Sequence, residues 1–162
     1  MEPRIIGLYV NPQGGVPKHA VETLRVTPTG CDGDRQNDLK HHGGPTRAVC
    51  LMLESVMKKL ISEGHPIGPG TTGENILIHG LEPNSIKGGS ILDVGTVRLQ
   101  ITGPAPPCKT IKSSFLNEEF TALSHKLDPN QTRWYASVIQ EGTVATGQRV
   151  SVLSESEQVG SQ

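Results

Sequence analysis

Short apolar runs separated by glycine and proline dominate the hydrophobic pattern of the chain. Runs of this length, bounded by turn residues, are typical of strands. We expect strands near residues 5–10, 21–27, 48–53, 75–79, 90–94, 97–102, 134–139 and 149–153. A glycine, Gly95, lies between two of these runs, as in a tight hairpin.

Two segments show helical spacing instead. In residues 54–64, Val56, Met57, Leu60 and Ile61 recur at the helical period, and Gly64 is a suitable C-cap. A second helix is expected over 115–127, with its apolar positions on one face: Phe115, Leu116, Phe120, Leu123 and Leu127. The pattern predicts a mainly β, β-barrel-like and mostly antiparallel domain with two or three short helices. It would span residues 1–153, with a polar, disordered tail over 154–162.

Composition narrows the classes of function. The 162 residues are enough to bury a core, and 15 basic against 16 acidic residues give a net charge of −1. That charge and an aromatic content of 3% argue against nucleic acid as a partner. No apolar stretch approaches the roughly 20 residues of a membrane span, and the N-terminus does not resemble a signal peptide. Three cysteines without a Cys-x-x-Cys pair indicate a reducing, cytoplasmic location.

The most informative residue is Cys108, which ends the proline-rich segment 103–108. We expect the strand before it to stop pairing at Gly103 and Pro104, so that the cysteine is held on a stiff turn. Lys109 lies next to it, and a neighbouring cation favours the thiolate, which attacks sulfur or binds a soft metal. The alternative is a cysteine that only packs under the loop.

The other two cysteines are weaker candidates. Cys50 lies in the apolar run 48–53 and is expected to be a small buried hydrophobic residue. Cys31 is flanked by Asp32 and Asp34, which would raise its pKa. Neither environment suits a nucleophile.

Two glycine-containing segments offer anion contacts. Residues 68–73 match G-x-G-x-x-G, but a β-like run follows where a dinucleotide motif requires a helix. Its backbone N–H groups and threonine hydroxyls could still hold a phosphate, and the alternative is an ordinary surface loop. In residues 42–47, Gly43 and Gly44 permit close backbone approach and Arg47 suits a phosphate. His42 could contact a ligand or only brace the turn.

Together these segments resemble the MOSC domain, the C-terminal domain of molybdenum-cofactor sulfurase and its stand-alone bacterial relatives. The family's His-Gly-Gly-Pro-x-Arg-Ala matches residues 42–48, its Gly-Glu-Asn-Ile/Leu matches 73–76, and its Pro-Cys matches 107–108. A late block matches Trp134, Tyr135, Gly142, Val144 and Gly147. The resemblance runs from about residue 6 to 153, and Gln148 departs from it where relatives usually carry Asp.

The resemblance implies a MOSC-type barrel and the molybdenum cofactor, with Cys108 as catalytic residue and molybdenum ligand. The cofactor-binding residues that it implies are His42, Gly43, Gly44, Arg47, Thr72, Gly73, Glu74, Asn75 and Lys109. Family members either reduce N-hydroxylated small molecules, with electrons from a separate donor protein, or carry sulfur as a cysteine persulfide received from a sulfur donor.

We favour the reductase, because the sequence shows no fused pyridoxal-phosphate desulfurase and no ferredoxin-like domain. Pyridoxal phosphate binding is implied only by association with the MOSC family, and no residue of this sequence indicates it. The sulfur carrier and a non-catalytic module that holds or delivers the cofactor remain as alternatives.

Overall fold

The computed structural model describes residues 2–35, 45–154 and 157. The strands are β1 (Arg4–Val10), β2 (His19–Ala20), β3 (Thr23–Thr27), β4 (Gly30–Cys31), β5 (Val49–Leu53), β6 (Ile76–His79), β7 (Ile91–Val94), β8 (Val97–Ala105), β9 (Arg133–Gln140), β10 (Gly142–Ala145) and β11 (Val150–Val152). The α-helix is α1 (Glu54–Ser62), and the 3-10 helices are η1 (Pro83–Ser85), η2 (Lys109–Ser114), η3 (Leu116–Glu118) and η4 (Phe120–Leu123).

The described strands form two sheets. An eight-stranded sheet has the order β11-β7-β8-β9-β5-β6-β1-β2, and a three-stranded sheet has the order β10-β3-β4. All pairings are antiparallel except that of β5 with β6. The mainly β, mostly antiparallel class is therefore confirmed. The strands do not form one closed barrel, although Arg4 of β1 bridges Arg149, next to β11.

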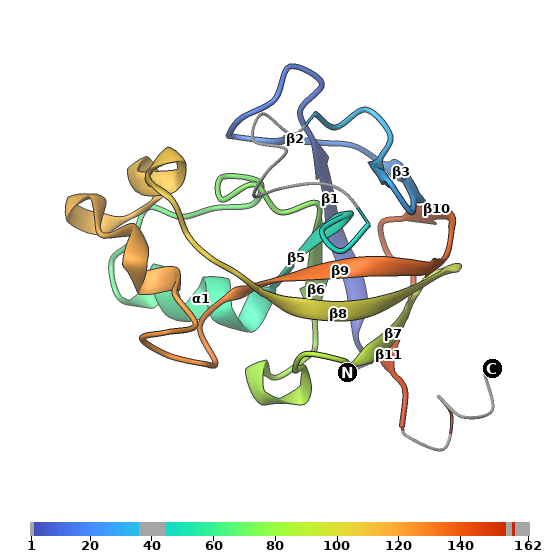
Figure 1. Ribbon diagram of the computed structural model, residues 1–162. Coiled ribbons are helices and arrows are strands. Elements are labelled where there is room, and N and C mark those ends of the chain that lie inside the picture. Colours follow the sequence, from blue (N-terminus) through green and yellow to red (C-terminus); the bar gives the residue numbers. More distant parts are fainter. Residues whose placement is uncertain (1, 36–44, 155–156, 158–162) are drawn as a thin grey trace.

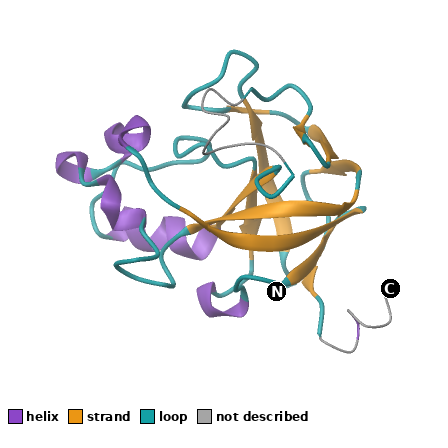
Figure 2. Cartoon of the chain, in the orientation of Figure 1, coloured by secondary structure: helices purple, strands orange, loops and turns teal. Residues whose placement is uncertain are grey.

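The core lies around the central strands. All five residues of β5 are buried, and the strand lies between β6 and β9 and is followed directly by α1 (Figure 1). Helix α1 buries Val56, Met57 and Leu60, as its spacing predicts, whereas Ile61 is 49% exposed. The 3-10 helices of residues 109–123 lie on the α1 side of the strands, so helical turns gather beside one end of the sheet (Figure 2).

The predicted second helix over 115–127 is wrong. The segment forms η3 and η4, and η3 is itself kinked, because Asn117 and Glu118 have positive φ values of 53° and 59°. Left-handed residues interrupt α-helical hydrogen bonding, and asparagine tolerates that conformation well. Only Phe115 and Leu123 are buried among the apolar positions named, while Leu116 and Leu127 are 48% and 70% exposed.

The expectation that pairing stops at Gly103 is also wrong. The predicted hairpin forms between β7 and β8, where Val94 pairs with Val97, but β8 continues through Pro104. A register shift between Ile101 and Gly103 marks a bulge, which accommodates a proline that a regular ladder would not. As a result Ala105 pairs with Arg133, and Cys108 lies three residues beyond the end of the strand. The short strands β2, β4 and β10 were not predicted.

Candidate functional site

Cys108 lies on the connection from β8 to η2. Its side chain is partly exposed, whereas Cys31 and Cys50 are buried. The Sγ atom lies 2.7 Å from Oγ1 of Thr110, and the Cys108 carbonyl accepts a hydrogen bond from the Ile111 N–H at 3.1 Å. These contacts hold the residue at the start of the 3-10 turn. Lys109, next in the chain, is exposed.

Tyr135 is a buried residue whose ring lies beside Arg47. Tyr135 is 6% exposed, and the Arg47 Cζ atom lies 5.6 Å from the centroid of its ring. Burial is the main cause that raises the pKa of Tyr135, and the charges of Arg47 and Cys108 also act on it, the first lowering and the second raising the pKa. Arg47 therefore lies against the Tyr135 ring, and the charges of both Arg47 and Cys108 reach its phenol, although the two residues are far apart in the sequence.

The loop 70–75 folds around the buried carboxyl group of Glu74. Glu74 is 0% exposed, and its two carboxylate oxygens accept hydrogen bonds from the Gly70 N–H at 2.9 Å and the Thr72 hydroxyl at 2.8 Å. Gly73 has a φ of +82°, the left-handed conformation that favours glycine. The Thr72 hydroxyl and one loop N–H, which the sequence offers to an anion, are thus engaged within the protein.

Burial raises the pKa of Glu74, although the hydrogen bonds from Gly70 and Thr72 oppose the shift. An acid with a raised pKa binds its proton more tightly in the folded chain than in the unfolded one. The free energy of unfolding should therefore fall as the pH rises above the ordinary value of 4.5 and through the raised pKa.

Glu74→Gln removes this titration, so the variant should gain stability relative to the wild-type protein as the pH rises. Urea unfolding of both proteins between about pH 4 and pH 8 checks this. A difference in stability that does not change with pH would contradict the assignment.

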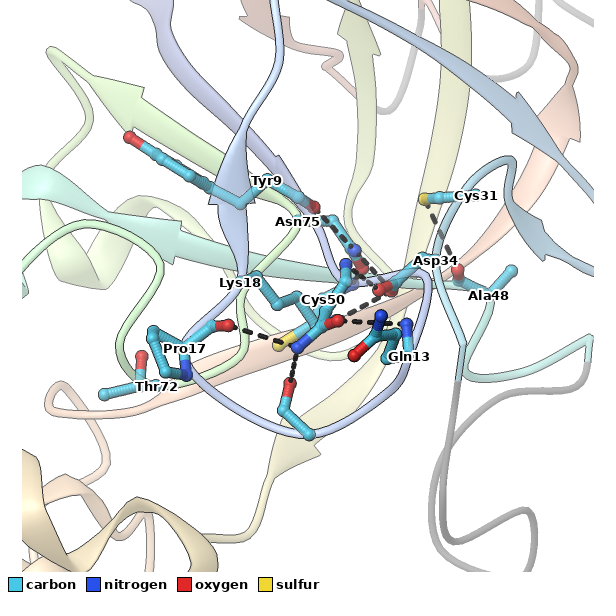
Figure 3. A network of polar contacts seen from close by, with 12 residues as sticks. Tyr9, Gln13, Pro17, Lys18, Cys31, Asp34, Ala48, Cys50, Thr72 and Asn75 are labelled. Atoms are coloured by element: carbon cyan, nitrogen blue, oxygen red, sulfur yellow. Dashed lines mark hydrogen bonds and ion pairs between the residues drawn. The ribbon is translucent and has the colours of Figure 1, made fainter.

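Asn75 belongs to a buried polar network (Figure 3). Its Oδ1 accepts a hydrogen bond from the Cys50 N–H at 3.0 Å, and its Nδ2 donates to the Tyr9 carbonyl at 3.2 Å and to Asp34 Oδ2 at 2.8 Å. Asp34 Oδ2 also lies 2.7 Å from Lys18 Nζ, in an ion pair whose side chains are only 3% and 6% exposed. Asn75 therefore joins the loop 70–75 to the segments that carry Lys18 and Asp34.

The two buried cysteines have the properties that the sequence predicts. Burial, followed by the charge of Asp34, raises the pKa of Cys31 to about 12. Burial also raises the pKa of Cys50, which is 5% exposed. Both thiols are shielded and protonated near neutral pH.

Iodoacetamide should therefore modify Cys108 first. At neutral pH and in the absence of denaturant, we expect one alkylated peptide, containing Cys108, before Cys31 or Cys50 reacts. Mass spectrometry of peptides sampled over time checks the order, and labelling in denaturant, where all three cysteines react, is the control. Earlier labelling of Cys31 would contradict the exposure and charge argument.

Three of the predicted cofactor-binding residues, His42, Gly43 and Gly44, lie outside the described residues. Within the described part of the chain, no group of three or more His, Cys, Asp or Glu side chains could hold a metal ion. No helix in that same part is both long and apolar enough to cross a membrane.

The sequence analysis gives no role to Lys18 or Arg133, and it names Asp34 as an acidic neighbour of Cys31. Lys18 and Asp34 come from polar loops, and nothing in either loop indicates that they pair. Arg133 did carry a signal, because it is a charged residue directly before the mainly apolar run 134–139. A buried strand rarely holds an arginine without partners.

The MOSC domain family matches residues 38–151 of the chain, which include Arg47, the loop 70–75 and Cys108. The chain belongs to the MOSC domain family. YflK of Bacillus subtilis is 28% identical over 129 residues, which are 78% of this chain and 57% of YflK. YiiM of Escherichia coli is 27% identical over 135 residues, 81% of this chain and 59% of YiiM. This MOSC chain thus matches less than two thirds of the length of either relative.

Solved structures show the same fold. The crystal structure of YuaD from Bacillus subtilis has a TM-score of 0.74 at 18% identity, covering 93% of this chain and 94% of YuaD. That of Escherichia coli YiiM has a TM-score of 0.68 at 22% identity, covering 96% of this chain and 71% of YiiM. At these identities the similarity concerns the MOSC fold alone.

Proposed function

We propose that this MOSC protein binds the molybdenum cofactor and reduces N-hydroxylated small molecules, with Cys108 as the protein ligand of molybdenum. The observation that carries the proposal is the difference in solvent exposure among the three cysteine thiols. In a domain of this family, Cys108 is the cysteine that remains accessible, while burial shields Cys31 and Cys50.

The residues present fit the cofactor. Thiolate is a soft ligand, apt for molybdenum beside a dithiolene. Arg47, which lies against the Tyr135 ring, supplies a cation for the terminal phosphate, and exposed Lys109 supplies a second. Backbone groups of Gly43 and Gly44 and the side chain of His42 would complete the contacts on the segment that leads to Arg47.

The loop 70–75 has a different part in this proposal. Its buried side chains Thr72, Glu74 and Asn75 form hydrogen bonds within the protein. They would therefore fix the conformation of the loop and not contact the cofactor directly. Gly73 would let the backbone approach the ligand. Asn75 therefore orients the loop, which is one of the two roles that the sequence allowed for it.

The chemistry proposed is the conversion of an N–OH group to N–H. Two electrons and two protons enter, the N–O bond breaks, and the oxygen leaves as water. The cofactor, when bound, supplies the two-electron redox chemistry. A separate donor protein would deliver the electrons. The protein itself holds the thiol in place, pairs with the phosphate and excludes bulk water from the buried side of the site.

The sulfur carrier is the second candidate, because an accessible thiol can also form a persulfide. A carrier must present its sulfur to a donor and then to an acceptor. The contact with Thr110 and the short turn around Cys108 instead favour a fixed ligand.

Turnover tests the proposal. Protein from a host that makes the cofactor should convert an N-hydroxylated base to the amine with a chemical reductant, and cofactor-free protein should not. A persulfide mass shift without molybdenum would support the carrier instead. Bound cofactor without turnover would support a holding or delivery module.

A further inference from the structure

Arg133 is a buried arginine under the loop that carries Cys108. It is 4% exposed and is the first residue of β9, where it pairs with Ala105, the last residue of β8. The proline-rich loop continues directly from Ala105, so Pro106 lies within hydrogen-bonding reach of the Arg133 guanidinium group. Its place follows from the register of two strands.

The guanidinium group joins two loops. Nη1 donates a hydrogen bond to the Thr72 carbonyl at 2.6 Å, and Nη2 donates to the Pro106 carbonyl at 3.0 Å and the Ala105 carbonyl at 3.5 Å. Thr72 belongs to the loop 70–75, and Pro106 lies two residues before Cys108. One planar fork therefore fixes the distance between these segments, which a lysine could do only in part.

This arrangement is costly if its only purpose is packing. Among the described residues, Arg133 forms no ion pair within 4.0 Å, and its buried Nε atom has no hydrogen-bond partner. A buried cation bonded only to carbonyls loses more hydration than an apolar side chain of similar volume. What an apolar side chain cannot provide is the connection between the two loops.

We propose that Arg133 is a positioning residue that holds the Cys108 loop against the loop 70–75 and so sets the accessibility of the Cys108 thiol. Its importance for the reaction rests on the proposed function, whereas its effect on the thiol does not. Loss of the fork frees the turn that begins at Pro106, and Cys108 becomes more accessible.

The test is the rate of alkylation of Cys108 by iodoacetamide in cofactor-free protein near neutral pH. Arg133→Met should raise the rate about tenfold, the scale of one lost hydrogen bond from a charged donor. Arg133→Lys keeps the cation and can replace part of the bridge, so it should give a smaller rise of about threefold. Partial rescue by the conservative variant separates positioning from general packing.

Lys18→Met is the matched control, because it also removes a buried cation, but its side chain pairs with Asp34 and not with the carbonyls of the Cys108 loop. It should lower the melting temperature without altering Cys108 alkylation. An unchanged rate in Arg133→Met, or an equal rise in Lys18→Met, would overturn the proposal. If Arg133→Met does not fold, Arg133→Lys decides, and a wild-type rate there overturns it. Because the readout needs no cofactor, this test can fail while the proposed function stands, and the reverse.

Discussion

Cys108→Ser should abolish reduction of the N-hydroxylated substrate. We expect a loss of about a thousandfold or more, the scale observed when a group at the reacting centre is removed. The melting temperature should change little, because the side chain is partly exposed and its side-chain contact is with the exposed Thr110. Turnover and thermal unfolding of the same preparation check both parts.

Cys31→Ala is the matched control. Removal of this buried thiol should lower the free energy of unfolding by about 1 kcal/mol and leave turnover unchanged. A fully active Cys108→Ser variant would exclude both the reductase assigned to this cysteine and the persulfide carrier. The holding or delivery module would then be the best account of the domain.

Asp34→Asn should lower the free energy of unfolding more than any of the other substitutions. The Asp34 carboxylate lies 2.7 Å from Lys18 Nζ and accepts further hydrogen bonds from the Asn11 N–H and Asn75 Nδ2. Removal of its charge leaves a buried ammonium group without its carboxylate partner, which costs about 3–5 kcal/mol. For a chain of this size the melting temperature should fall by about 6–20 °C.

The control for this variant is Asp32→Asn, since Asp32 is exposed two residues earlier. It should change stability by no more than about 0.5 kcal/mol. If both variants unfold at the same temperature, the buried pair contributes no net stability. The network would then serve only to orient the loops.

Much of the fold could be predicted from local patterns. The runs that became β1, β5, β6, β7, β8 and β9 are apolar with sharp turn boundaries, and α1 follows the helical period. The second helix failed because Asn117 and Glu118 take left-handed conformations, which the apolar spacing does not reveal. The course of β8 through Pro104 depends on a bulge against β9, and a bulge is set by the register of two strands.

The candidate site, like the fold, could be predicted only in part. That Cys31 and Cys50 are poor nucleophiles could be predicted from their immediate neighbours, and their burial agrees with it. The partners of Asp34 and Arg133 could not, because Asn75 lies 41 residues from Asp34 and Thr72 lies 61 residues from Arg133. Such contacts exist only once the loops pack together, so sequence proximity gives no sign of them.

The most direct test of the central claim is the molybdenum content of protein purified from a host that makes the cofactor. The account predicts stoichiometric molybdenum in the wild-type protein and loss of the metal from Cys108→Ser, with both proteins folded. Molybdenum absent from the wild-type protein, or retained equally by Cys108→Ser, would contradict the assignment of Cys108 as the ligand.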